Sequence, residues 1–223
     1  MRAFVDLHCH TSASFDSLAN PAGVARAAAA RGLTHLAITD HDRIDGALAA
    51  RDAAPAGLTI LVGEEIRTTA GDLIGIFLER PVARDLSPAD AVAAVREQGG
   101  LVGIPHPFDR FRGSLGRAED GIHALVGLVD WIEAYNARLI GRGNERAAEL
   151  ALANGLPGVA VSDAHTTMEV GVAYTAMDGD PSTPAGLRDA LATAEIVPGR
   201  ASYAARLVTP VAKLVQRGRG AGR

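Results

Sequence analysis

The sequence is poor in cysteine and has no long apolar run. Of its 223 residues only Cys9 is a cysteine, so no disulfide forms within the chain, and a reducing compartment is expected. No stretch approaches the roughly 20 apolar residues of a membrane helix. The first residues lack the apolar segment and cleavage site of a secretory signal. We therefore expect a cytoplasmic protein with no membrane partner.

An excess of positive charge is also missing. The chain has 22 basic and 26 acidic residues, a formal charge of -4, so no general basic field is available to bind long nucleic acid. Its 48% hydrophobic and 22% charged residues are typical of an ordinary globular protein. We expect one domain over residues 1–205, followed by a basic tail, 206–223, that is solvated and frayed.

Short apolar runs alternate with alanine-rich segments of helical spacing. The runs predict buried strands at 4–7, 36–39, 59–62, 73–78, 101–104, 129–134 and 159–162. The alanine-rich segments predict helices at 21–31, 46–54, 88–98, 144–154 and 184–194. This alternation predicts an α/β fold with a largely parallel sheet, and seven such strands suffice for a small barrel.

Two histidines follow the first predicted strand. In FVDLHCH, a period of two puts His8 and His10 on one face, with Leu7 and Cys9 on the other. Burying two imidazoles side by side is costly unless a shared partner satisfies both, so a metal ion is favoured over a hydrogen-bonded pair. Cys9 is interpreted as a small core residue.

Similar motifs follow other predicted strands. In AVSDAHT, Asp163 and His165 share a face and offer one oxygen and one imidazole. In LAITDHD, His41 is the expected ligand, Asp40 a supporting or capping group, and Asp42 a cap of the next helix.

A carboxylate and a further histidine complete the set. In LVGEEI, Glu65 is expected to reach the histidines, and Glu64 to lie at the surface or in support. The prolines on both sides of His106 hold that imidazole at a fixed angle, although a plain turn histidine is the alternative. His35 and His123 lack such a context and are interpreted as structural or surface residues.

In order and spacing, these motifs resemble the PHP family (polymerase and histidinol phosphatase). The motifs DLHCHTS, ITDHD, VGEEI, IPHP and SDAHT carry the resemblance, which covers about the first 175 residues. It implies a distorted (β/α)7 TIM-like barrel with a parallel core, and two or three divalent metal ions that serve the hydrolysis of phosphate esters.

The resemblance also implies a ligand set. One metal would be held by His8, His10, Glu65 and Asp163, and a second by Glu65 and His106. A third would be held by His41 and His165, with Asp16 as the candidate for its remaining ligand, unless Asp16 caps the following helix. Asp72 stands where many relatives have a histidine, so it is either an oxygen ligand or a sign that the second metal is weakly held.

Substrate contacts are expected from the stretch IEAYNARLIGRGN, which resembles the later part of small family members. Asn136 and Arg138 become candidates, Arg138 because its planar guanidinium binds phosphate through two hydrogen bonds. Arg110 is a further candidate, and a surface ion pair is the alternative for each arginine. The expected mechanism is attack by a metal-bridging hydroxide, with Asp163 or His165 assisting proton transfer.

Nitrogen and oxygen donors without thiolate favour manganese, with iron or zinc as alternatives. A small phosphorylated substrate, a nucleotide or a metabolite, is expected. Three other functions are alternatives. A metal-dependent amidohydrolase usually needs a bridging lysine, and Lys213 in the tail is the only lysine. A non-catalytic module would bind metal or nucleotide to regulate a partner. A proofreading nuclease is disfavoured by the acidic net charge.

Overall fold

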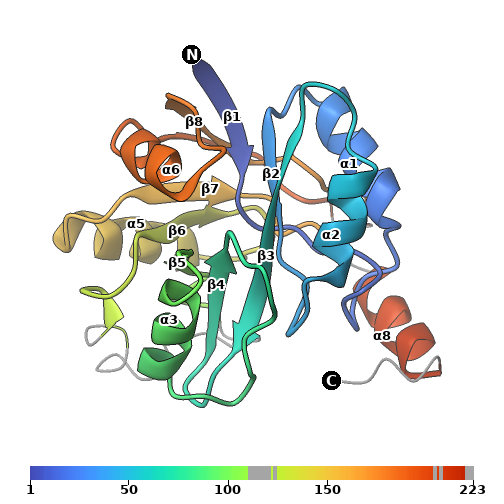
Figure 1. Ribbon diagram of the computed structural model, residues 1–223, viewed down its shortest axis with the longest axis horizontal. Helices are drawn as coiled ribbons and strands as arrows, with labels where there is room; N and C mark the ends of the chain where they lie inside the picture. Colours follow the sequence, from blue (N-terminus) through green and yellow to red (C-terminus); the bar gives the residue numbers. More distant parts are fainter. Residues whose placement is uncertain (110–121, 123–124, 203–204, 206–207, 219–223) are drawn as a thin grey trace.

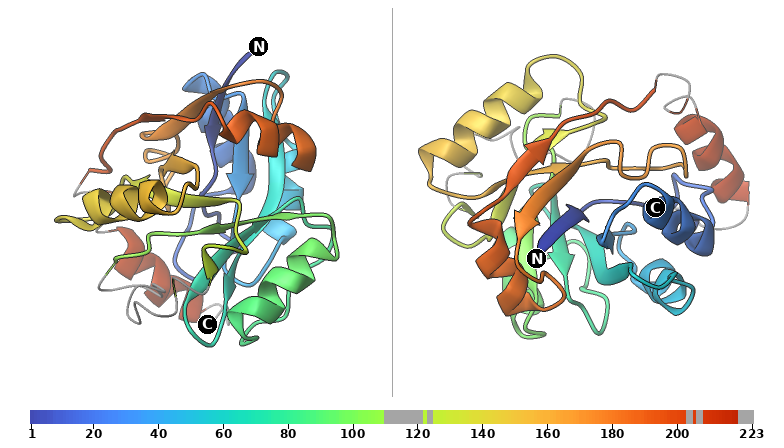
Figure 2. Two further views of the ribbon diagram at one scale, coloured as in Figure 1. Left: turned by 90° about the vertical axis from the view of Figure 1, so that its left-hand side faces the viewer. Right: turned by 90° about the horizontal axis from the view of Figure 1, so that it is seen from above.

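A single curled sheet surrounded by helices forms the molecule. The computed structural model describes residues 1–109, 122, 125–202, 205 and 208–218. Within them the strand order is β7-β6-β5-β4-β3-β2-β1-β8-β9, and Figures 1 and 2 show the sheet curling into a nearly closed barrel. The strands are β1 (Arg2–Asp6), β2 (His35–Ile38), β3 (Thr59–Arg67), β4 (Asp72–Ile76), β5 (Leu101–Ile104), β6 (Trp131–Asn136), β7 (Gly158–Val161), β8 (Tyr174–Asp178) and β9 (Glu195–Val197).

The helices lie mainly between the strands, as the alternating pattern predicted. They are α1 (Pro21–Ala30), α2 (Asp45–Asp52), α3 (Pro88–Arg96), α5 (Gly143–Ala153), α6 (Pro184–Leu191) and α8 (Val208–Gly218). The side chains of Asn20, Ser87 and Thr183 each accept a hydrogen bond from the backbone N–H three residues later, and a proline follows each of them. These caps satisfy N–H groups that a helix start leaves without partners, and they fix where α1, α3 and α6 begin.

The predicted α/β barrel-like fold is confirmed, but the sheet is mixed rather than largely parallel. Strand β4 is antiparallel to both β3 and β5. Only residues 68–71 separate β3 from β4, and a parallel connection needs a dozen or more residues. Two strands that the sequence reading missed, β8 and β9, are also antiparallel to their neighbours.

Two apolar layers hold the fold together. Strand side chains such as Val5, Leu61 and Trp131 fill the barrel interior together with Leu7, just after β1, and Leu187 of α6. The other layer packs the outer helices on the sheet. Leu7 belongs to the inner layer and Cys9 to the outer one, so the prediction that they share a face is wrong. Strand β1 ends at Asp6, and its alternation does not continue to Cys9.

The C-terminal segment was predicted to be frayed, but residues 208–218 form helix α8. Its Ala212 and Gln216 side chains are buried. Figures 1 and 2 show α8 beside the segment that follows β1. Among the described residues, no helix has both the length and the apolarity needed to cross a bilayer.

Candidate metal centre

The carboxyl ends of β1 and β7 lie next to each other and bring two motifs together. Antiparallel β8 pairs with β1 itself, but beyond the strand ends Cys9 forms a parallel bridge with Ala164. The His10 N–H donates to the Ala164 carbonyl at 2.8 Å, and the Asp163 N–H donates to the His8 carbonyl at 3.0 Å. His8 and His10 therefore lie against Asp163 and His165.

The segment that follows β2, together with β3 itself, continues this arrangement around the barrel. The Thr39 N–H donates to the Cys9 carbonyl at 2.8 Å, and His41 forms a parallel bridge with Glu65. Four segments far apart in the sequence thus present their polar side chains at one end of the sheet, where sites of parallel α/β folds assemble.

One set of four donors, called here the Glu65 group, consists of His8, His10, Glu65 and Asp163. The two histidine Nε2 atoms are 2.9 Å apart, and each is 3.3 Å from Glu65 Oε2. Asp163 Oδ1 lies 3.8 Å from His8 Nε2 and 3.7 Å from His10 Nε2. Ligands of a tetrahedral ion bound at 2.0–2.2 Å are about 3.4 Å from one another. The spacing of these donors therefore fits a divalent cation.

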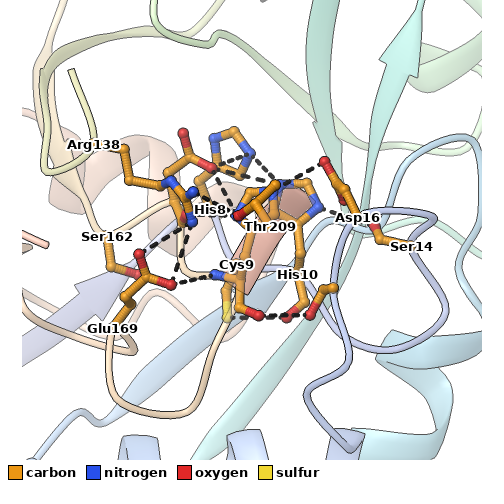
Figure 3. A network of polar contacts seen from close by, with 12 residues as sticks. His8, Cys9, His10, Ser14, Asp16, Arg138, Ser162, Glu169 and Thr209 are labelled. Atoms are coloured by element: carbon orange, nitrogen blue, oxygen red, sulfur yellow. Dashed lines mark hydrogen bonds and ion pairs between the residues drawn. The ribbon is translucent and has the colours of Figure 1, made fainter. Parts of the chain in front are cut away.

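The second set, called here the Asp16 group, consists of His10, Asp16, His41 and His165. Asp16 Oδ2 is 3.3 Å from His41 Nε2 and 3.1 Å from His165 Nε2. Asp16 is 5% exposed, and its Oδ1 has no hydrogen-bond partner among the described residues. A buried carboxylate left in this state is costly unless a cation binds it. His10 belongs to both groups, and Figure 3 shows part of this crowded network.

The residues expected around a second metal are only partly together. His106 Nε2 lies 3.2 Å from Glu65 Oε1, so Glu65 directs its two oxygens to different imidazoles. Asp72 is buried at the start of β4, in register with Arg67. It lies outside both donor groups, so the structure gives no support to Asp72 as a ligand.

Charges in the centre favour the ligand forms of the carboxylates. Burial raises the pKa of Glu65, but His41 and His8 outweigh it and hold this pKa well below its usual value. In the same way His165 and His41 lower the pKa of Asp16 despite its burial. Burial and the neighbouring imidazoles of His165, His41 and His8 lower the pKa of His10, which keeps this ring neutral.

His8 behaves differently because carboxylates surround it. Burial alone would lower its pKa, but Glu133, Asp163 and Glu65 raise it well above 6.5. A cation that binds His8 Nε2 must therefore displace a proton.

Glu133 is a functional residue that the sequence reading missed. Its Oε1 lies 2.6 Å from His8 Nδ1, and its Oε2 accepts hydrogen bonds from the His106 N–H and the Asn136 amide, both at 2.9 Å. Second partners of this kind fix the orientation of metal-binding imidazoles. The available signal was a carboxylate at the centre of the WIEA part of the apolar run predicted at 129–134, which also contains Asp130.

Smaller contacts hold the other ligands. Ser14 Oγ lies 3.1 Å from His10 Nδ1 and accepts the His41 N–H at 3.0 Å. Asp40 accepts hydrogen bonds from the backbone and hydroxyl of Thr11, in keeping with a supporting role. Asp42 does not cap α2, whose N-cap is Ile44 without a side-chain bond; it accepts the Arg67 N–H instead.

The expected substrate residues face protein groups. Arg138 forms an ion pair, but a largely buried one rather than the surface pair given as its alternative: Nη1 donates to Glu169 at 3.1 Å. Its Nη2 donates to Thr209 at 2.8 Å (Figure 3). The Asn136 amide donates to Glu133 and Asp163, so it positions those carboxylates. Arg110 and His123 lie outside the described residues.

The remaining expectations concern residues around the centre. His35 is buried away from it beside Thr34 and Ser182. Glu64 is buried rather than exposed, and it accepts the Val82 N–H.

Two ligand candidates have a left-handed backbone. The φ angles are 51° at Asp163 and 25° at His106. Residues other than glycine adopt such angles at a cost, and functional sites are one place where this strain is retained. This local turn brings Asp163 toward the histidines.

Comparison with known proteins agrees with this geometry. A profile of the PHP domain matches residues 6–142, and a profile described as PHP-associated matches residues 141–196. Two uncharacterised proteins of Methanocaldococcus jannaschii are each 34% identical, one over 59% of this chain and 81% of its own length, the other over 76% and 68%.

A solved structure shows the same fold. A two-domain protein of Bacteroides vulgatus that contains a predicted PHP-like metal-dependent phosphoesterase superimposes with a TM-score of 0.74 at 21% identity. The match covers 89% of this chain and 65% of that protein. The motifs at the carboxyl ends of the strands, the barrel-like sheet and the matched profile lead to one conclusion: the chain belongs to the PHP domain family.

Proposed function

We propose that this protein is a metal-dependent phosphoesterase that hydrolyses a small phosphate ester, a nucleotide or a phosphorylated metabolite. The observation that carries the proposal is the sharing of His10 between the Glu65 group and the Asp16 group. A neutral imidazole can bind only one of two cations, but because the two groups meet at His10 their sites are neighbours, and neighbouring cations are the usual arrangement for phosphoester hydrolysis. Divalent ions held there would neutralise phosphate oxygens and activate water.

The chain's own residues prepare the centre for this chemistry. Glu65, Asp163 and Asp16 supply the negative charge that holds divalent cations, while Glu133 and Ser14 fix the imidazoles of His8 and His10. Asp163 Oδ2 accepts a hydrogen bond from Asn136, which orients the carboxylate. We assign proton transfer at the leaving group to Asp163 or His165.

Manganese is the proposed metal, with iron or zinc as alternatives. The donors are imidazole nitrogens and carboxylate oxygens, whereas magnesium and calcium prefer oxygen alone. Cys9 adds no thiolate, because burial raises the pKa of its thiol well above 9.0 and its side chain lies in the outer apolar layer.

A small substrate fits the charge of the chain better than long nucleic acid does. The net charge of -4 offers no general attraction for a polyanion. The single lysine, Lys213, is on α8, and its amino group lies over the ring of Phe15 rather than between the donor groups. This position does not suit a lysine that bridges two metals, as in an amidohydrolase. A regulatory module without catalysis is the remaining alternative.

The test is an assay of the purified chain loaded with manganese, iron or zinc. Phosphate release is measured in parallel on monoesters and diesters of nucleotides, sugars and amino-alcohols. His8→Ala should lose at least 100-fold in turnover, while the control His35→Gln, outside both donor groups, should retain it. The proposal fails if the chain holds one ion or fewer, or if His8→Ala hydrolyses these esters as fast as the parent.

A further inference from the structure

Helix α8 contacts the loop that follows β1 through one buried amide. Gln216 is 3% exposed, and its Nε2 donates to the carbonyls of Ser12, Ser14 and Ser17 at 2.8, 3.3 and 3.0 Å. All three partners are acceptors, so only the NH2 end of the amide satisfies them. About 200 residues of chain separate Gln216 from this loop, and the helix therefore restrains a distant part of the sequence.

That loop carries part of the metal centre. Asp16 is a member of the Asp16 group, and Ser14 Oγ contacts both the His10 ring and the His41 N–H. The Ser17 hydroxyl donates to the His165 carbonyl at 2.9 Å. A shift of the loop would therefore move Asp16 and loosen two imidazoles at once.

The first turn of α8 reaches the other side of the same group. Thr209 Oγ1 accepts a hydrogen bond from Arg138 Nη2, and Arg138 Nη1 pairs with Glu169. Glu169 Oε2 in turn accepts the His165 N–H at 3.1 Å and the Thr166 hydroxyl at 3.0 Å. Arg138 and Glu169 are both buried or nearly so, with side chains 10% and 1% exposed. Figure 3 shows Arg138, Glu169 and Thr209 beside the histidines.

We propose that α8 positions the ligands of the Asp16 group, so that a cation binds there tightly only while this helix is docked. Gln216 positions the loop of Asp16, and Thr209 positions the loop of His165 through Arg138 and Glu169. The inference rests on the metal centre of the proposed function, but not on the identity of the substrate. Gln216 and Thr209 are positioning residues, since neither belongs to either donor group.

Two substitutions remove these contacts while the new side chain keeps nearly the shape of the original one. Gln216→Met deletes the amide and leaves three carbonyls without their donor, and Thr209→Val deletes the acceptor of Arg138. Loss of groups that orient metal ligands usually lowers metal affinity by about 10- to 100-fold. Each variant should therefore weaken the Mn²⁺ site of the Asp16 group by about that factor and change the other site less, because the two groups share only His10. The double variant should bind Mn²⁺ at this site at least as weakly as either single variant, and the two losses need not add because both loops hold ligands of one group.

Matched controls are available in the same chain. Gln98, the only other glutamine of the sequence, accepts the N–H groups of Glu79 and Arg80, and Thr193 contacts Asp178 and Ala190. Gln98→Met and Thr193→Val make the same chemical changes away from the centre. They should lower the melting temperature without changing Mn²⁺ binding.

The measurement is calorimetric titration of the full metal-free chain with Mn²⁺, together with elemental analysis of bound ions and amide hydrogen exchange over residues 12–17. Weaker binding at one site class and faster exchange in Gln216→Met support the inference. If Gln216→Met melts at a lower temperature but binds Mn²⁺ like the parent, α8 only stabilises the fold and the inference is overturned. If the parent chain binds a single ion, the proposed function and the inference are both overturned. Unchanged Mn²⁺ binding in Gln216→Met overturns the inference alone, so the two failures can be told apart.

Discussion

Glu133→Gln tests whether a buried carboxylate sets the binding form of His8. Glu133 contacts three groups: the His8 Nδ1 atom, the His106 N–H and the Asn136 amide. An ionised carboxylate only accepts hydrogen bonds, whereas a glutamine amide has one donating end. If the NH2 end faces the His106 N–H and the Asn136 amide, hydrogen-bond donors face one another and both hydrogen bonds are lost. If it faces His8, the ring proton moves to Nε2, the atom that faces the Glu65 group.

The expected loss follows from either arrangement. Removing the partner of a metal-binding histidine costs about 10- to 100-fold in affinity, which corresponds to about 1.4 to 2.8 kcal/mol. Titration of the metal-free variant with Mn²⁺ measures this loss directly. Because the volume of the side chain hardly changes, packing contributes little to the effect.

Glu64→Gln is the matched control, because it makes the same change in another buried carboxyl group. Glu64 accepts the Val82 N–H and lies outside both donor groups, so its substitution should leave Mn²⁺ affinity unchanged. Equal affinity in Glu133→Gln and the parent would refute the role of Glu133. Equal losses in both variants would show a general effect of burying an amide.

Three further predictions concern charge and packing. Burial raises the pKa of Glu64 from 4.5 to about 8, so the stability of the metal-free chain is full below the lower value and falls as the pH rises toward the higher one. Glu64→Gln should flatten this profile in thermal melts and add at most about 3 kcal/mol at neutral pH. Glu133, Asp163 and Glu65 outweigh burial and raise the pKa of His8; Mn²⁺ affinity should therefore increase with pH, and titrations in buffers of different ionisation enthalpy should reveal proton release. A Cβ at Gly103 would lie 2.1 Å from Trp131 Cε2, so Gly103→Ala should lower the free energy of unfolding in urea by about 1–3 kcal/mol.

Local sequence signals predicted most helices and seven of the nine strands in the described sheet because each signal lies within a few residues. A cap such as Asn20 followed by Pro21 marks a helix start wherever the rest of the chain goes. β9 is a three-residue strand with two exposed residues, too short to show a period. β4 is antiparallel because only the short turn 68–71 connects it to β3, and the alternation of predicted strands and helices did not reveal this turn.

The ligand residues were recognisable for a different reason. Histidines and carboxylates at strand ends form motifs, and the family resemblance gave their order. The face of each residue was harder to predict, because β1 ends at Asp6 and Asp163 has a φ of 51°. Alternation with a period of two applies only while the backbone is extended.

Supporting residues escaped the sequence because their partners come from distant segments. Glu133 touches His8 across 125 positions, and Gln216 touches Ser12 across 204. In the sequence, Gln216 is an ordinary polar residue of a C-terminal helix, and its burial and its partners become apparent only in the folded structure. The same reason explains Arg138, whose charge looked available for phosphate and is directed to Glu169 in the fold.

The charge balance of the centre then indicates an order of events. Glu65, Asp163, Asp16 and Glu133 gather buried negative charge in one place, and Arg138 is directed to Glu169 beside it. An anionic ester entering the metal-free centre would meet these carboxylates and be repelled. The same carboxylates attract divalent cations, which reverse the sign of the local charge. For the proposed phosphoesterase we therefore expect metal binding to precede substrate binding, and we expect release of a cation from the Asp16 group, including release by undocking of α8, to weaken binding of the phosphate.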